Sequence, residues 1–468
     1  RPTWERAVAN LPIIGMPRRR GWRNAAFILG SQPLATTPRG PAPLQTHGSN
    51  QTRKLFAPFA ALRAADGRAA EIIAPPYDVL TAEEALKRAA GKPRNFLHVS
   101  RAEIDFPPVA DSHAPEIYGR AAQNLSALIK DGAMVRVPRR AYFVYRMRIS
   151  GHSQTGLAGG ASIAAYEADV IKRHELTRPD KEDDRVKHME ALNAQTGPVL
   201  LAHRPDATLA AALEDVAQRD NAPEIDITAE DGVRHTLWQI DDGETLDNVQ
   251  SAVDALDALY IADGHHRSAA AARVAATRRV ANPDGKNADP ARERFLAVLF
   301  PSDQLLILAY NRIVRSLGTE DEAALLDRLE LEYDVRPAGA PIRPNHPAQI
   351  GLCLNSGWNL LNPRMPPARE APALERLDVS LLTDGILQPL LGIGDPRTDP
   401  RLDFVGGADA PERIEAQVRS GNAAAGFTLY PTAMDELMAV ADGGQIMPPK
   451  STWFEPKLAD GLIAHLID

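Results

Sequence analysis

The spacing of apolar residues along this chain predicts helices and strands that alternate from one end to the other. Leu246, Val249, Val253 and Leu256 mark one face of a helix, and residues 114–130 predict another that ends at a glycine. Residues 142–149 and 233–240 predict strands, and residues 161–170 are expected to pair with the first of them around a glycine-rich loop. The pattern therefore predicts a mixed α/β (α+β) protein.

Local composition suggests three parts. Residues 1–54 mix arginine, proline, glycine and threonine without a sustained period, so we expect a disordered N-terminal extension, either translated from upstream of the natural start or serving as a targeting segment. Residues 55–335 are expected to form the core. The proline-rich segment 337–347 is expected to mark a change of subdomain, with residues 336–468 forming a C-terminal α/β subdomain that closes the site.

Length, composition and charge exclude several classes of protein and of binding partner. The 468 residues are enough for two or three domains, and no apolar run is long enough for a membrane span. The single cysteine, Cys353, excludes an internal disulfide framework and a multi-cysteine metal site, and a cytoplasmic location is expected. A net charge of −8 argues against broad binding to nucleic acid.

The most informative stretch is a strand, a polar turn and an alanine-rich helix over residues 259–273. The free N–H groups of a helix's first turn attract anions, and Gly264 lets a phosphate approach the backbone. His265, His266 and Arg267 add donors and positive charge, while Asp263 suggests a metal ligand, a general base or an orienting group. The alternative is a capped junction whose polar residues face water.

A second candidate is the pair His174 and Glu175, which lies among five cationic residues. The carboxylate is suited to deprotonate a hydroxyl group while the cations, Arg185 among them, hold phosphate. The alternative is a solvated charge cluster at a helix start, which the spacing alone slightly favours.

Residues 444–452 imitate a phosphate-binding P-loop, but Pro449 has no N–H to donate where that loop needs glycine. We expect instead a stiff loop that presents Lys450 and Thr452 to the site. Its alternative role is to anchor Trp453 and Phe454 in a core.

Four motifs occur in order: PPYDV (75–79), RHELT (173–177), DGHHR (263–267) and MPPKSTWF (447–454). Together they resemble domain-of-unknown-function family one-thousand-and-fifteen, whose members are often labelled ParB/RepB-like, over roughly residues 55–467. The turn 263–267 is more distantly similar to that of the ParB/sulfiredoxin superfamily, whose free-serine kinases also carry an upstream His-Glu pair. The catalytic cysteine of sulfiredoxin has no counterpart here, so its chemistry does not transfer.

The resemblance implies a ParB/sulfiredoxin-like nucleotide-binding core and a phosphotransferase that acts on a small hydroxylated metabolite, with serine or phosphoserine as the first guess. ADP, ATP, pyrophosphate or phosphate is the expected partner, and Mg²⁺, with Asp263 as its ligand, the expected cofactor. The expected catalytic residues are Glu175 as base, His174 and Asp263; the phosphate- or nucleotide-binding residues are Gly264, His265, His266, Arg267, Arg185 and Lys450; the substrate-binding residues are Tyr77, Asp78, Thr177 and Thr452.

Three other functions remain open at this point. A ParB-like regulator would sense CTP or ATP through the same turn without chemistry on a metabolite. A phosphoserine phosphatase would run the related hydrolysis. A DNA-partitioning factor is disfavoured by the net charge of −8.

Overall fold

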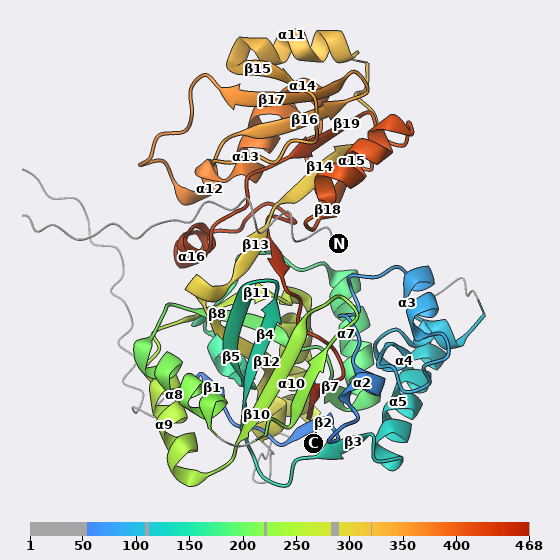
Figure 1. Ribbon diagram of the computed structural model, residues 1–468, viewed down its shortest axis with the longest axis vertical. Helices are drawn as coiled ribbons and strands as arrows, with labels where there is room; N and C mark the ends of the chain where they lie inside the picture. The colour runs from blue at the N-terminus through green and yellow to red at the C-terminus, as the bar shows by residue number, and fades with distance from the viewer. Residues whose placement is uncertain (1–53, 108–111, 220–221, 282–289, 320, 468) are drawn as a thin grey trace, which may run out of the picture.

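The computed structural model describes residues 54–107, 112–219, 222–281, 290–319 and 321–467, which form two bodies that each combine a sheet with helices (Figure 1). This arrangement confirms the predicted mixed α/β class. The predicted N-terminal extension, residues 1–54, lies outside the described residues except for Lys54.

The lower body in Figure 1 is built on one mixed sheet, to which the described ranges contribute nine strands. The sheet is antiparallel except for two parallel pairs, β6 with β11 and β8 with β12. In spatial order the strands are β6 (Ile171–Lys172), β11 (Leu259–Asp263), β8 (Val199–His203), β12 (Arg294–Pro301), β5 (His152–Ser162), β4 (Tyr142–Ile149), β10 (Arg234–Ile240) and β9 (Ile225–Thr228), and β1 (Phe56–Ala57) pairs with β5.

Helices cover this sheet in two groups. The first group packs α10 against α7 and α7 against α5, and the second packs α8 against α9 and across β4, β5 and β10. The helices of the lower body are α2 (Ala69–Ile72), α3 (Ala82–Ala89), α4 (Leu97–Ser100), α5 (Pro115–Lys130), α6 (Ile163–Glu167), α7 (Pro179–Leu192), α8 (Ala207–Gln218), α9 (Gly243–Asp254) and α10 (His265–Ala281).

Two small sheets return the end of the chain to the lower body. In the first, β21 (Ile463–Leu466) lies between β2 and β7, so the C-terminal strand pairs with one of the first strands of the described chain. The other strands of these two sheets are β2 (Ala61–Ala64), β3 (Met134–Arg136) and β7 (Ala194–Gln195) in the first, and β13 (Leu306–Leu308) and β20 (Trp453–Glu455) in the second.

The upper body is built on a six-stranded sheet of described residues. Its strands, in spatial order, are β15 (Tyr333–Ala338), β17 (Gly357–Pro363), β16 (Ile350–Leu354), β19 (Ala425–Thr428), β14 (Tyr310–Val314) and β18 (Leu402–Gly406). Its helices are α11 (Glu322–Glu332), α12 (Ala373–Arg376), α13 (Asp378–Leu382), α14 (Gln388–Leu391), α15 (Ala410–Arg419) and α16 (Met434–Asp442). The proline-rich segment links β15 to β16 within this sheet, and the division of the chain into domains at residues 54 and 335 stays a prediction.

Most of the predicted elements are present where the apolar spacing indicated them. The predicted helices correspond to α5 and α9, and the predicted strands to β4 and β10. Thr81 caps α3 because its hydroxyl accepts the Glu84 N–H while the Glu84 carboxylate accepts the Thr81 N–H.

The predicted strand over residues 161–170 is wrong. The strand β5 instead runs through the glycine-rich segment that the prediction treated as a loop, and α6 follows it directly. The Ser162 hydroxyl caps α6 by accepting the Ala165 N–H at 3.2 Å, which ends the strand and begins the helix.

Close packing explains why glycine occupies this strand. A Cβ atom on Gly156 would lie 2.6 Å from the Leu299 carbonyl oxygen, and one on Gly159 would lie 2.5 Å from the Phe56 ring. Both distances are below van der Waals contact, so the strand can lie here only without side chains at these positions.

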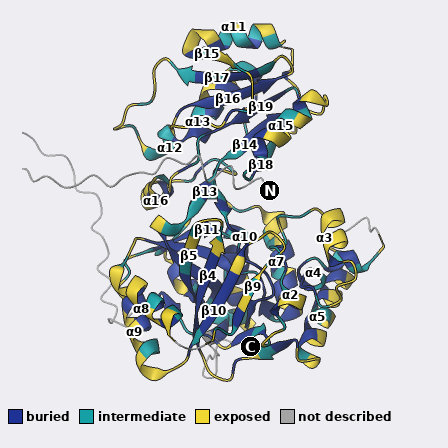
Figure 2. Cartoon of the chain, in the orientation of Figure 1, coloured by how far each residue is buried: buried dark blue, intermediate teal, exposed yellow. Residues whose placement is uncertain are grey.

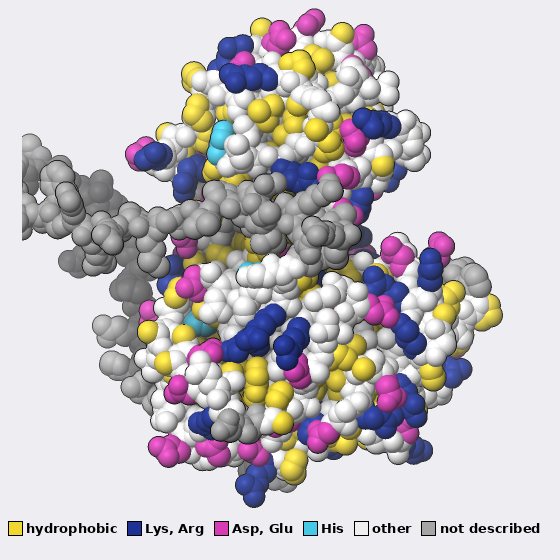
Figure 3. Space-filling view, viewed as in Figure 1, with side chains coloured by type: hydrophobic (Ala, Val, Ile, Leu, Met, Phe, Trp, Pro, Cys, Tyr) yellow, Lys and Arg dark blue, Asp and Glu magenta, His cyan; other side chains and the backbone are white. Residues whose placement is uncertain are grey.

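The core of each body follows its sheet. The strands β4, β5 and β12 are buried along most of their length and appear dark blue in Figure 2. Acidic and basic side chains are interspersed on the face drawn in Figure 3. Among the described residues, no helix is both long enough and apolar enough to cross a membrane.

We predict that Gly156→Ala lowers the free energy of unfolding by about 1–3 kcal/mol, the usual cost of overpacking, because its Cβ would collide with the backbone of β12. Thermal unfolding followed by circular dichroism measures the effect. The matched control is Gly119→Ala on α5, where a Cβ meets nothing within 4 Å. Equal unfolding midpoints for the two variants would contradict the packing argument.

Candidate functional site

The turn 263–267 connects the buried strand β11 to the first turn of α10. Gly264 has a φ of 103°, a conformation that residues with a side chain rarely adopt. A Cβ there would also lie 3.1 Å from the guanidinium carbon of Arg267. Glycine is therefore favoured at this position mainly by its backbone conformation, and a side chain would also crowd the Arg267 guanidinium.

The guanidinium of Arg267 points into the protein. Its side chain is 5% exposed, one Nη donates to the Pro198 carbonyl, and the other lies 3.6 Å from the Asp263 carboxylate. Arg185, also buried, donates to the Asp184 carboxylate and lies 4.0 Å above the Tyr77 ring. Both arginines expected to bind phosphate are thus engaged in internal contacts.

The two arginines border a cavity of about 10 Å³ together with Asp460. This volume suits a single buried water molecule. Burial raises the pKa of the Asp460 carboxyl to about 7, although Arg267 and Arg185 oppose the shift. No sequence motif singled out Asp460, because only the return of the C-terminal segment brings it under the turn.

Asp263 forms an ion pair that the sequence did not indicate. Lys457 Nζ lies 3.1 Å from Asp263 Oδ2 and 4.7 Å from the centre of the Trp453 ring. Burial acts to raise the pKa of Asp263, but Lys457 and Arg267 hold it well below its ordinary value. Both oxygens of the carboxylate therefore face cations, a poor fit for a Mg²⁺ ligand, and the Mg²⁺ site at Asp263 stays a prediction.

His174 and Glu175 reach the turn through strand pairing. Residues Ile171 and Lys172 of β6 pair in parallel with Leu259 and Tyr260 of β11, so both chains leave the sheet at the same edge. The His174 and His265 rings meet edge to face with their centres 4.4 Å apart. This contact brings the two motifs together, while the catalytic roles assigned to them stay predictions.

Burial sets the protonation of this cluster. Burial lowers the pKa of His174 to about 4 and that of His265 well below its ordinary value, so both rings are neutral at pH 7. Burial raises the pKa of Glu175, while Lys450 acts in the opposite direction. A carboxylate with a raised proton affinity suits acid–base chemistry.

Residues 447–454 approach the same cluster. The Met447 N–H donates to the His174 carbonyl at 2.8 Å, and the backbone of Lys450 is hydrogen-bonded to the Glu175 carboxylate. The predicted approach of this loop to the site is thereby confirmed. Both predicted roles of the loop hold in part, because Phe454 is also buried in the core while the Lys450 side chain is exposed.

Arg312 of β14 holds the loop in place and was missed by the sequence analysis. Its buried guanidinium donates to the carbonyls of Pro449 at 3.0 Å and of Lys450 at 3.1 Å. An arginine inside an apolar strand gives no sign of its partner in the sequence, so only the tertiary contact identifies it.

The remaining predicted residues lie around this centre. The His266 Nε2 accepts the Arg178 N–H at 3.1 Å, and the Thr177 hydroxyl donates to Glu182. Asp78 is exposed, while Tyr77 and Thr452 are half-buried. The structure thus brings the DGHHR turn, the His-Glu pair and Lys450 together, and the roles assigned to all these residues stay predictions.

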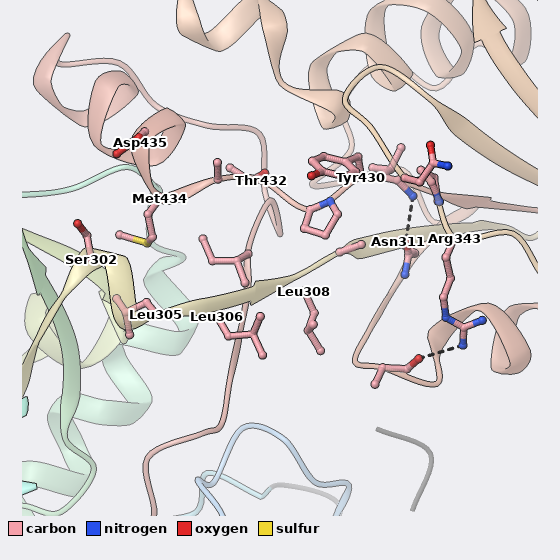
Figure 4. A pocket seen from close by; sticks show the side chains of 18 of the residues that line it. Ser302, Leu305, Leu306, Leu308, Asn311, Arg343, Tyr430, Thr432, Met434 and Asp435 are labelled. Atoms are coloured by element: carbon pink, nitrogen blue, oxygen red, sulfur yellow. Dashed lines mark hydrogen bonds between the residues drawn. The ribbon is translucent and has the colours of Figure 1, made fainter. Parts of the chain in front are cut away.

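Two larger cavities flank the cluster. One of about 360 Å³ has Glu175, Met447 and Pro448 on one wall and residues of the upper body on the other. The second, of about 1000 Å³, extends along β13 between Ser302 and Tyr430 (Figure 4). The loop 447–454 lines the first cavity through Met447, Pro448 and Pro449, and it is linked to the second because Thr432, which lines that cavity, donates to the Ser451 carbonyl at 3.1 Å.

The chain is similar to several solved structures. They include a conserved hypothetical protein from Pyrococcus furiosus (15% identity, 66% of this chain and 95% of that chain, TM-score 0.33). Others are a free serine kinase in complex with AMP (14%, 64% and 86%, TM-score 0.32) and SbnI with a C-terminal truncation from Staphylococcus aureus (10%, 65% and 85%, TM-score 0.33). At these scores the likeness transfers no activity to this chain.

No curated protein matches the sequence. A family model does match it, over residues 56–380, which is more than half of its 468 residues. The chain therefore belongs to the family described as protein of unknown function (DUF1015), as its four motifs indicated.

Proposed function

We propose that this protein transfers a phosphoryl group to or from a small hydroxylated metabolite, with serine or phosphoserine as the first candidate. An adenine nucleotide or inorganic phosphate is the second reactant. The observation that carries the proposal is the position of Glu175, whose carboxylate lies between a cavity of about 360 Å³ and the cation-rich turn at the start of α10. A cavity of this volume accommodates a small metabolite.

Glu175 takes the proton of the attacking hydroxyl group. Burial raises the pKa of this carboxyl, which makes it a stronger base than an exposed glutamate. The nearby Lys450 ammonium opposes that rise in the pKa of Glu175. The backbone hydrogen bond from Lys450 further fixes the orientation of the carboxylate toward the cavity.

The transferred phosphoryl group binds at the start of α10. The first N–H groups of a long helix have no intrahelical partners, and the ammonium groups of Lys450 and Lys457 contribute positive charge beside them. Arg267 and Arg185 act as positioning residues, because their guanidinium groups are engaged with Pro198 and Asp184. They hold the turn and α7 rather than contacting the phosphate.

The lining of the 360 Å³ cavity favours a substrate that carries an amino group. It includes the acidic residues Glu375 and Asp384 and the hydroxyl residues Ser380 and Thr383, while its one arginine, Arg397, is paired with Asp395 at 3.0 Å. Carboxylates bind an ammonium group through charge-assisted hydrogen bonds, which supports serine over an uncharged alcohol.

We predict that Glu175→Gln lowers the turnover number by about 10²–10⁴-fold, the usual contribution of a general base, with the affinity for ligand largely kept. The assay follows phosphate movement when the protein is mixed with serine and ATP or ADP, or with phosphoserine. Glu190→Gln, an exposed position on α7, is the matched control.

Full turnover by Glu175→Gln would remove the catalytic assignment. Nucleotide binding by the wild-type protein without any phosphate movement would instead favour the regulatory alternative.

We predict that Lys450→Met weakens the binding of ADP or phosphoserine by about tenfold, equivalent to ~1.4 kcal/mol, because one exposed cation beside the phosphate is lost. Isothermal titration calorimetry measures the affinity, and the thermal midpoint is recorded in parallel. Lys187→Met, also exposed on α7, is the control. A lowered midpoint with unchanged affinity would leave Lys450 with a structural role alone.

A further inference from the structure

Three side chains with metal-binding atoms converge beside the turn. One nitrogen of His174, one nitrogen of His265 and a carboxylate oxygen of Glu175 all lie within 4.8 Å of one another. They come from two separate elements, the segment after β6 and the first turn of α10. The convergence therefore depends on tertiary structure and is not a result of sequence adjacency alone.

Each of the two histidines has a buried nitrogen without a partner. Among the described residues, His174 Nδ1 and His265 Nε2 have no hydrogen-bond partner, and the two residues are only 2% and 6% exposed. A buried polar atom left unpaired is costly, so such atoms in a folded protein call for a ligand, an ion or a water molecule.

The surroundings of the His174 ring suit a metal ligand. The ring has a backbone hydrogen bond with Ile261 that acts to raise its pKa, and its Nδ1 is buried without a hydrogen-bond partner among the described residues. Metal-binding histidines commonly donate their second nitrogen to a backbone carbonyl. Burial also keeps both rings neutral, with the pKa of His174 lowered to about 4.

We propose that His174 Nδ1, His265 Nε2 and the Glu175 carboxylate bind a divalent first-row transition metal ion, with Zn²⁺ as the best-fitting member of the class. Two imidazoles and one carboxylate suit Zn²⁺, Mn²⁺, Fe²⁺ or Co²⁺, whereas Mg²⁺ and Ca²⁺ prefer ligands that are all oxygen. Three protein ligands leave a coordination position open, as in catalytic zinc sites.

Tetrahedral coordination requires the three ligand atoms to move closer together. Ligand atoms around a tetrahedral Zn²⁺ lie about 3.4 Å apart when the bonds are ~2.0–2.1 Å long, whereas those of the cluster lie within 4.8 Å of one another. Glu175 is the half-buried member of the three, and its approach to the metal would loosen its hydrogen bond with the Lys450 backbone. Metal binding goes beyond the proposed phosphoryl transfer, since it requires neither nucleotide nor metabolite.

Metal binding at this cluster has one consequence for the reaction, which rests on the proposed function. A carboxylate bound to a metal is a weaker base toward a hydroxyl group than a free carboxylate. The metal and the attacking hydroxyl therefore compete for Glu175, and excess Zn²⁺ inhibits the transfer reaction.

The test uses the full chain, free of any affinity tag and stripped of metal with a chelator. Zn²⁺ is titrated against a chromophoric chelator, and Co²⁺ is titrated while the visible absorption of low-coordinate cobalt is followed. We expect one equivalent of each metal to bind, and Zn²⁺ to raise the thermal midpoint of the wild-type protein.

Separate His174→Ala and His265→Ala variants should each weaken Zn²⁺ binding by about 100-fold or more and abolish the cobalt absorption, since each removes one ligand of three. Glu175→Gln, which is nearly isosteric and lies at a half-buried position, keeps the test valid if a histidine variant fails to fold. Its expected loss is about tenfold or more. His266→Ala is the matched control in the same turn, because His266 Nε2 already accepts the Arg178 N–H.

The absence of stoichiometric binding would overturn the proposal, as would binding that survives both Glu175→Gln and His174→Ala. A water molecule would then be the partner of the two nitrogens. Because the titration contains no nucleotide or serine, its outcome is independent of whether phosphoryl transfer is found.

Discussion

The pairing of Asp263 with Lys457 is the interaction around which the site is arranged. A carboxylate at the end of a buried strand is withdrawn from water, and its charge must be matched by nearby cations. Lys457, from the C-terminal segment, places its Nζ 3.1 Å from one oxygen of this carboxylate. Arg267, from α10, places an Nη 3.6 Å from the other oxygen. The C-terminal segment is therefore bound to β11, the strand beside the edge strand β6 in the sheet of the lower body, and β21 adds a second connection by pairing with β2 and β7.

Arg312 is a second buried charge that connects segments far apart in the sequence, here β14 of the upper body and the loop 447–454. Its guanidinium lies inside the protein without a carboxylate partner among the described residues, and burial lowers its pKa to about 10. It donates instead to backbone carbonyls, including those of Pro449 and Lys450. Lys450 has a φ of 56°, which is costly for a residue with a side chain and requires support from its surroundings. A β14 residue thus fixes the loop that covers Glu175.

The site has two halves of different electrostatic character. On one side lie the cations Arg267, Lys457 and Lys450, and on the other the neutral imidazoles of His174 and His265. The first half is suited to anions, and the second to a metal ion that needs unprotonated nitrogen. Glu175 lies at the boundary, within 4.8 Å of the histidine nitrogens and hydrogen-bonded to the backbone of Lys450. The two proposals made here therefore share this one carboxylate.

The sequence by itself determined the mixed α/β class, most of the helices and strands and the motifs that mark the family, because apolar spacing, capping and turn chemistry are local properties. It also identified the DGHHR turn and the His-Glu pair. Only the tertiary structure decided that Arg267 and Arg185 point inward, that Lys457 and Arg312 belong to the site, and that the glycines of β5 lie in a strand. The reason is physical: the partner of a charge and the space beside a Cβ are often set by distant segments, as for Lys457 and Asp263, which are 194 residues apart, and local sequence does not encode such contacts.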